Sequence, residues 1–322
     1  SRCQREGRGF DPLCPLHKLV IKSKLITNIF QQFLKDKDIR DFKDSFIYYI
    51  IFRIIRKLLS YDLILQIYNF KVYGSINKNK TSYFLLKKCE FGDYHELDMI
   101  KKFSTMNKLL FIDCGCNYGF YSFYTASLNK NNMIISIEAS KNTSVEFVKN
   151  HKLNNFSNII FFNKAVTDMN NKQILFYESI NDWESSQTHK DFNFEKTTKI
   201  ESINIDTLVK KYDLKKYNTI IKLDIEGNEM SAIKGGLEFI KETSPLIIIE
   251  FSKFIFNKKE NKDFLKNFLT TFDYSIYNVF KKKRKLEEVL KDLDDLGISH
   301  KTIGNYYLIK NSSKTLQDFL FN

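Results

Sequence analysis

An acid, an asparagine and two glycines are closely spaced in one stretch, Asp113-Cys-Gly115-Cys-Asn117-Tyr-Gly119. Its two glycines let the backbone turn sharply and approach a ligand without a Cβ in the way. A helix that begins after the loop would present free N–H groups to an acceptor on that ligand. The acid at the start of the loop would repel a pyrophosphate and attract a cationic or hydroxyl-rich ligand. An ordinary turn between a strand and a helix could carry the same glycines.

A second acid, Glu138, follows the next apolar run about 20 residues further on, where a carboxylate can accept both hydroxyls of a ribose. Ala139 comes directly after it, and the small residue Ala165 leaves room for an adenine ring. These features point to an adenosine-containing ligand. S-Adenosylmethionine carries an ammonium, a sulfonium and a ribose, so it fits the acidic loop. NAD uses the same second acid, but the third glycine of its loop is missing here.

Acidic side chains also follow two later apolar runs. Asp224, Glu226 and Glu229 come after Thr219-Ile-Ile-Lys-Leu, and Glu250 ends Leu246-Ile-Ile-Ile. Carboxylates at strand ends beside a ligand loop are costly unless they are used. They are candidate general bases, together with His189 in an aperiodic stretch, 178–198, that we expect to be a loop over the cleft. We assign no metal ligand, because backbone and cap bonding can account for these acids, although they could also hold a divalent cation.

The elements that must position these residues alternate between strands and helices, which predicts an α/β fold. Apolar runs predict buried strands at 109–112, 133–137, 158–163, 219–223 and 246–252, and helical spacing follows most of them. Strands are also expected at 174–177 and 199–205, with two closing strands at 274–280 and 302–309. A helix starting near residue 93 places Glu96 and His95 just before the loop, where either could face the cleft. Glu96 is included among the candidate cofactor-binding residues.

The chain is basic overall, with 51 Lys and Arg against 38 Asp and Glu in 322 residues, a net charge of +13. A nucleic acid or an anionic membrane is one interpretation. The lysines are scattered, however, which favours an origin in base composition. The five cysteines show no C-x-x-C pair, which argues against a disulfide framework or a zinc site and suits a reducing cytoplasm.

Residues 1–17 differ from the rest in being rich in arginine and proline and free of lysine, and we expect them to be upstream DNA translated by mistake. Residues 18–91 predict a helical extension over 18–70 and two short strands around the turn residues at 74–79. The apolar run within 45–60 is interrupted by Arg53, Arg56 and Lys57, so it falls short of a membrane span. A helix packed against the main domain or a second subunit is expected there, with peripheral membrane contact as the alternative.

Taken together, these motifs resemble the FkbM family of S-adenosylmethionine-dependent methyltransferases. The family shows an Asp-x-Gly-Ala-Asn-x-Gly loop and a Lys-Ile-Asp-x-Glu-Gly-x-Glu strand tip. The corresponding stretches here are Asp113–Gly119, with Cys116 in place of the usual Ala, and Lys222-Leu-Asp-Ile-Glu-Gly-Asn-Glu229. Glu138 and Ile248-Ile-Glu250 complete the likeness, which implies a domain over 92–310 followed by a tail, 311–322. It also implies a doubly wound, seven-stranded class I methyltransferase (Rossmann-like) sheet with an antiparallel hairpin at its edge.

The resemblance further implies methylation of a hydroxyl, mostly on sugars, polysaccharides or natural products. Gly115, Asn117 and Gly119 would then admit the cofactor, Asp113 would orient it, and Glu138 would hold its ribose. Asp224 or Glu226 is the expected base, since both follow the fourth strand. Two alternatives are a nucleic-acid methyltransferase and a non-catalytic adaptor that uses residues 18–70. The first lacks the Asn/Asp-Pro-Pro-Tyr/Phe motif, since Asp224-Ile-Glu226-Gly stands there and would repel phosphate.

Overall fold

The computed structural model divides into two units, residues 1–90 and 91–322. It describes residues 19–20, 50, 63–74, 93–106, 108–179, 194–210, 212, 217–295 and 302–313. The first unit contains an antiparallel sheet of β1 (Leu19–Val20), β2 (Leu63–Ile67) and β3 (Phe70–Gly74). Residues 1–17 and most of the helical extension expected over 18–70, including 45–60 apart from Ile50, lie outside the described residues. Within the expected extension, Leu19–Val20 forms strand β1 rather than part of a helix.

One prediction for this first unit is wrong. The stretch 63–67 forms strand β2 rather than the end of a helix, and it pairs with β3 through a turn at Tyr68-Asn69. The turn expected at 74–79 lies outside the described residues, apart from Gly74 at the end of β3. Tyr68 has a left-handed backbone, with φ at 48°, which a short hairpin turn requires. The buried side chains of Ile67, Phe70 and Val72 explain the strand pairing, because pairing lets them share one apolar face.

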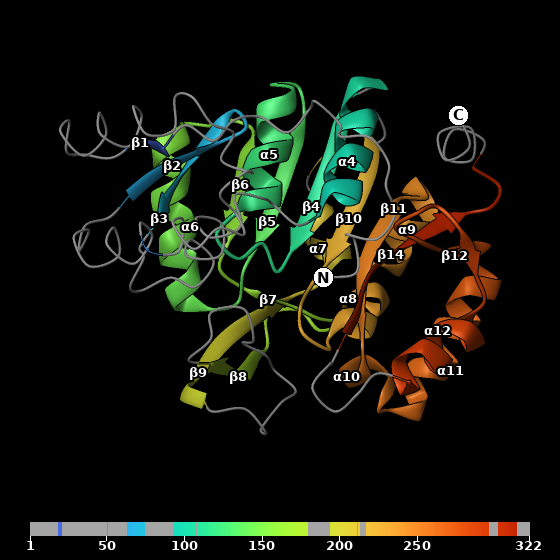
Figure 1. Cartoon of the computed structure of the whole chain (residues 1–322). Coiled ribbons are helices and arrows are strands. Elements are labelled where there is room, and N and C mark those ends of the chain that lie inside the picture. The colour runs from blue at the N-terminus through green and yellow to red at the C-terminus, as the bar shows by residue number, and fades with distance from the viewer. Residues whose placement is uncertain are drawn as a thin grey trace. The chain divides into compact units, whose positions relative to one another are not determined.

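The second unit is built on a central sheet whose strands follow the order β13-β12-β14-β11-β10-β4-β5-β6 (Figure 1). Strands β6, β5, β4, β10 and β11 are parallel, and β14 runs antiparallel to both β11 and β12. The bounds are β4 (Leu109–Cys114), β5 (Met133–Ile137), β6 (Ile159–Phe162), β10 (Asn218–Leu223), β11 (Leu246–Ser252), β12 (Tyr274–Asn278), β13 (Lys283–Arg284) and β14 (Thr302–Lys310). The predicted doubly wound sheet is confirmed, and the two-residue β13 extends the expected seven strands by one.

The strand order places the switch in winding direction between β4 and β10. From β4 the chain proceeds to β5 and β6 on one side, and it returns to β10 and β11 on the other. In open α/β sheets, ligands bind at the carboxyl ends of the strands beside such a switch point. Every residue of β4 is buried, which is why a continuous apolar run, rather than an alternating one, encodes this strand.

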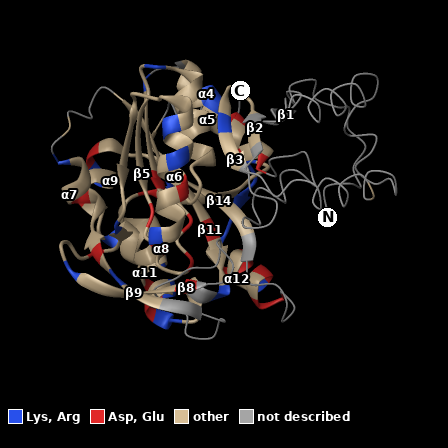
Figure 2. Ribbon diagram, turned by 90° about the vertical axis from the view of Figure 1, so that its left-hand side faces the viewer, with Lys and Arg blue, Asp and Glu red and all other residues tan. Residues whose placement is uncertain are grey.

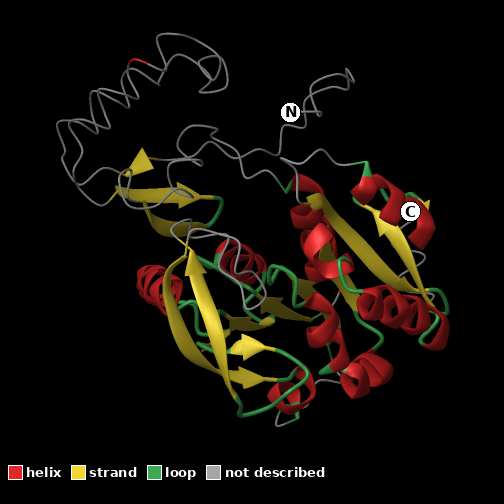
Figure 3. Cartoon of the chain, turned by 90° about the horizontal axis from the view of Figure 1, so that it is seen from below, coloured by secondary structure: helices red, strands yellow, loops and turns green. Residues whose placement is uncertain are grey.

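Helices cover both faces of the sheet (Figure 3). One face carries α4 (Tyr94–Met106), α5 (Phe120–Leu128) and α6 (Lys141–Asn154). The other packs Ile112, Ile221 and Ile249 against helices of the carboxyl-terminal half. The remaining helices are α7 (Ile205–Val209), α8 (Glu229–Lys234), α9 (Leu237–Thr243), α10 (Lys253–Phe256), α11 (Lys259–Thr271) and α12 (Leu286–Asp294).

Two helix boundaries are set by specific residues. Ser140 caps α6, and its side chain accepts a hydrogen bond from the Thr143 amide. The helical segment after β10 is divided into two helices, α8 and α9, which meet at Gly235 and Gly236. A Cβ on Gly235 would overlap the carbonyl oxygen of Thr167, so the break lets this chain segment approach a neighbouring backbone.

A smaller sheet of β7 (Ala165–Val166), β9 (Phe194–Ile203) and β8 (Gln173–Ser179) stands apart from the central sheet. The strands predicted at 174–177 and 199–205 therefore exist, but they pair with each other. The predicted loop over 178–198 is wrong at both ends, because β8 continues to Ser179 and β9 already begins at Phe194. Residues 180–193, including His189, lie outside the described residues.

Charges are mixed over the described elements, where Lys and Arg positions alternate with Asp and Glu positions (Figure 2). Isolated exposed pairs such as Lys149–Glu146 contribute little stability. Within the described part of the chain, none of the helices combines the length and the apolar character that crossing a bilayer requires.

Candidate functional site

The loop after β4 turns back onto β5 through its own backbone. The amides of Gly115 and Cys116 both donate to the carbonyl of Ile137, and the amide of Gly119 donates to the carbonyl of Cys116. Gly115 and Gly119 have φ values of 80° and 90°, in the region that glycine tolerates at no steric cost. A Cβ on Gly115 would overlap the carbonyl oxygen of Asp224. The loop is therefore pressed against the end of β10, while Gly119 starts helix α5.

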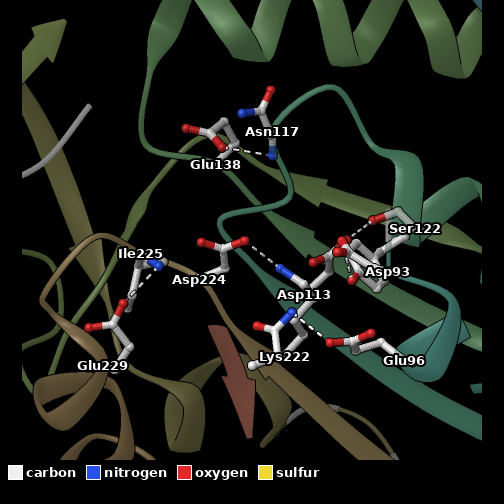
Figure 4. A network of polar contacts seen from close by, with 12 residues as sticks. Asp93, Glu96, Asp113, Asn117, Ser122, Glu138, Lys222, Asp224, Ile225 and Glu229 are labelled. Atoms are coloured by element: carbon white, nitrogen blue, oxygen red, sulfur yellow. Dashed lines mark hydrogen bonds and ion pairs between the residues drawn. The ribbon is translucent and has the colours of Figure 1, made fainter. Parts of the chain in front are cut away.

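Glu138 is fixed at the end of β5 by two backbone amides. Its Oε2 accepts from the Asn117 amide at 2.9 Å, and its Oε1 accepts from the Ser140 amide at 2.8 Å (Figure 4). The amides favour the carboxylate, but burial disfavours it more strongly and raises the pKa of Glu138 to about 7. Each oxygen can still accept a further hydrogen bond, so the side chain is oriented in advance for two hydroxyl donors.

The acids after β10 divide into two roles. Glu229 is 1% exposed, and its Oε1 accepts from the amides of Ile225 and Gly227 at 3.1 and 3.2 Å. It therefore stabilises the turn rather than facing a ligand, and burial raises its pKa to about 7. Asp224 and Glu226 instead line a cavity together with Glu250 of β11. One carboxylate oxygen from each of these three lies within 4.8 Å of the others.

Asp113 lies beneath the loop and is 1% exposed. Its Oδ2 accepts from the Ser122 hydroxyl at 2.6 Å, and that hydroxyl also lies 2.7 Å from the hydroxyl of Ser136. Its Oδ1 is buried and has no hydrogen-bond partner in the structure. Burial raises the pKa of Asp113 to about 6, although the nearby ammonium of Lys222 opposes the shift.

The cavity measures about 260 Å³ and opens at the carboxyl ends of β4, β5 and β10. Of the residues proposed from the sequence, it is lined by Gly115, Asn117, Glu138, Ala139, Ala165, Asp224, Glu226 and Glu250. Three others do not line it. Asp113 lies behind the loop, Gly119 begins α5, and Glu96 accepts from the Asn305 side chain at 2.8 Å.

Sequence reasoning missed the part of the cavity wall that comes from the smaller sheet. Phe176 of β8 lines the cavity, as do Lys164 and Val166. The next acid along β8, Glu178, is buried and bonds the Asn142 side chain at 2.9 Å and the Lys141 amide at 3.3 Å. These contacts tie β8 to the start of α6. Alternation within β8 could have identified Phe176 as inward-facing, but not what it faces.

Lys222 is a further residue that the sequence analysis assigned no role. Its side chain is 3% exposed between the apolar residues Ile221 and Leu223, and its Nζ donates to Asp224 Oδ2 at 2.7 Å. The signal in the sequence is a lysine flanked by Ile221 and Leu223 in a strand that should be buried on both faces.

The doubly wound sheet with its antiparallel strand β14, the glycine loop after β4 and the acids that follow β5 and β10 define the class I methyltransferase fold. The family model described as the methyltransferase FkbM domain matches residues 113–276, about half of the chain. The chain belongs to the FkbM family of S-adenosylmethionine-dependent methyltransferases. This match confirms the predicted family and, with it, the predicted cofactor, S-adenosylmethionine.

Several solved structures match the chain at low identity. A methyltransferase FkbM from Methylobacillus flagellatus KT is 20% identical, with a TM-score of 0.39, and the match covers 70% of this chain and 52% of that one. M. jannaschii TYW2 in complex with AdoMet is 11% identical (TM-score 0.37; 77% and 84% covered). An rRNA methylase from Streptococcus thermophilus is 10% identical (TM-score 0.36; 69% and 97% covered). The chain thus spans about half the length of the Methylobacillus protein. No curated protein matches the sequence.

Proposed function

We propose that this chain is an S-adenosylmethionine-dependent O-methyltransferase whose acceptor is a hydroxyl of a sugar, polysaccharide, glycolipid or natural product. One observation supports the proposal above all others. Glu138 and Asp224 follow the two strands that flank β4, and both line the cavity beside Gly115. That is the place where a doubly wound sheet binds its ligand.

The residues present fit the cofactor. Glu138 would accept the two ribose hydroxyls, since its oxygens are already held in place by backbone amides. The buried Oδ1 of Asp113, which lies behind the loop and has no hydrogen-bond partner in the structure, would orient the ammonium through a water rather than by direct contact. Ala139, Ala165 and Phe176 provide the small and apolar surface that an adenine ring needs. When bound, the cofactor supplies a methyl group on a positively charged sulfur.

The chain's own task is then to align an acceptor oxygen and to remove its proton. Alignment supplies much of the rate in an in-line displacement, because the reacting atoms must meet at the right distance and angle. Asp224 and Glu226 line the cavity from the turn after β10, and we assign the base to one of these two. Glu250 provides a third carboxylate nearby, which can bind further hydroxyls of the acceptor.

The charge of the cavity supports a hydroxyl-rich acceptor over a nucleic acid. Three carboxylates at its wall accept hydrogen bonds from hydroxyl donors and repel phosphate groups. The positive net charge of the chain does not offset this local effect, because charges on exposed surfaces are screened within about 10 Å at ordinary salt concentrations.

The test supplies methyl-labelled S-adenosylmethionine together with neutral glycans, phenolic natural products or RNA, and follows the label. We expect base-stable methyl ethers in a glycan or natural product and no label in RNA. Asp224→Asn and Glu226→Gln should each be compared with the wild type, and the base is the residue whose loss lowers kcat at saturating cofactor far more than it weakens cofactor binding. Label transferred to RNA, or to amines alone, would overturn the proposal.

A further inference from the structure

Polar side chains line up across three neighbouring strands on the face covered by α5. Ser136 of β5 is in register with Asp113 of β4, which is in register with Lys222 of β10. Partners in register on parallel strands point to the same face of a sheet. The residues on either side of Lys222, Ile221 and Leu223, point to the opposite face and belong to its apolar core. Lys222 is therefore placed in this polar row by the register of the sheet.

The ammonium of Lys222 is compensated by contacts from several elements. It donates to Asp224 Oδ2 at 2.7 Å and lies 4.6 Å from the centre of the Tyr121 ring of α5. Tyr121 in turn donates to Asp93 Oδ2 at 2.7 Å. Figure 4 shows Lys222 pointing toward Asp224, with Asp113, Asp93 and Glu96 nearby. These carboxylates raise the pKa of Lys222 above its ordinary value despite burial, so the side chain is charged.

The Lys222–Asp224 pair connects the buried polar row with the cavity. Lys222 is 3% exposed, whereas the side chain of Asp224 is 39% exposed and lines the cavity wall. Only Oδ2 of Asp224 is used by the lysine, so Oδ1 can accept from a ligand. A charge buried this deeply costs free energy that its interaction partners must offset.

We propose that Lys222 is a positioning residue that acts through Asp224. It holds that carboxylate in one orientation at the cavity wall, with Oδ1 turned to the bound cofactor and acceptor. This inference rests on the proposed function, because it assigns Asp224 a contact with the ligand. It goes beyond it in naming a buried residue that touches neither ligand and yet determines how the site binds them.

The experiment is a double-mutant cycle on S-adenosylmethionine binding, measured by calorimetry on the full chain. Lys222→Met should weaken binding at least tenfold, while Lys149→Met, which removes an exposed lysine paired with Glu146, should leave it within about twofold. In an Asp224→Asn background, Lys222→Met should cause little further loss, because the carboxylate it positions is no longer there.

Folding is monitored separately by thermal unfolding without ligand. If Lys222→Met fails to fold, the double variant Lys222→Met/Asp224→Asn, which leaves neither partner of the pair charged, is compared with Asp224→Asn alone. The inference would be overturned if Lys222→Met bound S-adenosylmethionine as tightly as the wild type. It would also be overturned if the fold-losses of affinity of the two single variants multiplied in the double variant, because the two residues would then act independently. A wild-type chain that binds no cofactor would instead refute the proposed function.

Discussion

Glu138 shows how a single carboxylate can be prepared for its ligand. Its two oxygens accept from the amides of Asn117 and Ser140, so its orientation is fixed before a ribose arrives. Fixing the side chain in advance spares the entropy that a free side chain would lose on binding. The position of this acid was predictable, because it follows a strand at the expected spacing after the glycine loop. Its anchoring to Asn117 was not, since that contact depends on the folded loop.

Replacing Glu138 with Gln should weaken S-adenosylmethionine binding by about 10- to 100-fold, since hydrogen bonds to a charged acceptor are worth about 1.5–3 kcal/mol. Glu146→Gln, on the exposed side of α6, is the matched control and should change affinity less than about twofold. Calorimetric titrations measure both. Equal affinities for the two variants would contradict the role assigned to Glu138.

Cofactor binding should also release a proton near neutral pH. Glu138 has a pKa of about 7 in the structure, and two hydroxyl donors would favour its ionised form. Affinity should therefore rise as the pH increases from about 6 to 8. Titrations at pH 6.5 in two buffers of different ionisation enthalpy measure the released proton. The release should be reduced in Glu138→Gln, and an unchanged release would place the titrating group elsewhere.

Gly115 can be tested against another glycine with a similar backbone. Gly115 and Gly304 have φ values of 80° and 93°, but only at Gly115 would a Cβ meet the Asp224 carbonyl, whereas at Gly304 nothing lies within 4 Å. Gly304→Ala should lower the free energy of unfolding by about 1–2 kcal/mol, the cost of a left-handed alanine. Gly115→Ala should lower it further and abolish cofactor binding. Urea denaturation and calorimetry measure the two effects, and equal losses would mean that steric overlap at Gly115 is unimportant.

Some residue roles could not be predicted because they depend on neighbours distant in sequence. Glu229 and Glu226 belong to one acidic motif, yet only the fold shows that Glu229 is buried against the amides of its own turn while Glu226 lines the cavity. Glu96 was expected to contact the cofactor, but it bonds Asn305, more than 200 residues away. Spacing alone does not specify such long-range contacts.

At the scale of elements, the smaller sheet provides the part of the site least apparent from the sequence. Its strands were predictable from alternating residues, but alternation does not reveal which strands pair. Strands of a separate sheet show the same alternation of residues as further strands of the central sheet would. The pairing of β7 with β9 at Ala165–Ser202 brings the small residue beside the cavity, and β8 adds Phe176 to its wall.

The contribution of this sheet can be measured with two neighbouring residues of β8. Phe176 is 5% exposed and lines the cavity, while Leu175 is 52% exposed on the opposite side of the strand. Phe176→Ala should weaken cofactor binding about tenfold, because a stacking contact with an aromatic ring is worth about 1–3 kcal/mol. Leu175→Ala should leave affinity within about twofold. Binding titrations measure the affinity of the two variants for S-adenosylmethionine. Similar affinities would exclude Phe176 from the adenine site.

At the scale of the whole molecule, three buried carboxyls couple stability to pH. Asp113, Glu138 and Glu229 have pKa values of about 6, 7 and 7, all above the ordinary values of 3.8 and 4.5. At a pH between the ordinary and the raised pKa values, the folded chain binds more protons than the unfolded chain. The contribution of these three groups to stability should therefore be greatest at a pH below their ordinary pKa values. It should decrease as the pH rises to about 7.

Denaturant unfolding between pH 5 and pH 8 tests this coupling on the ligand-free protein. The free energy of unfolding should decrease with pH, and Glu138→Gln should make the slope shallower by removing one of the three groups. The exposed Glu146→Gln serves as control and should leave the slope unchanged. A slope that Glu138→Gln does not alter would mean that Glu138 is ionised throughout this range.

The hydrogen bonds between Glu178 and the first residues of α6 affect how ligand binding changes the stability of strands outside the cavity. Strand β8 pairs with β9 along its length, from Gln173–Glu201 to Ser179–Phe194. A nucleoside that packs against Phe176 would stabilise the hydrogen bonds between β8 and β9. Deuterium uptake by the amides of both strands should therefore slow together, including amides that do not contact the ligand. Without the Glu178 anchor, the same strands should exchange quickly whether or not the cavity is filled.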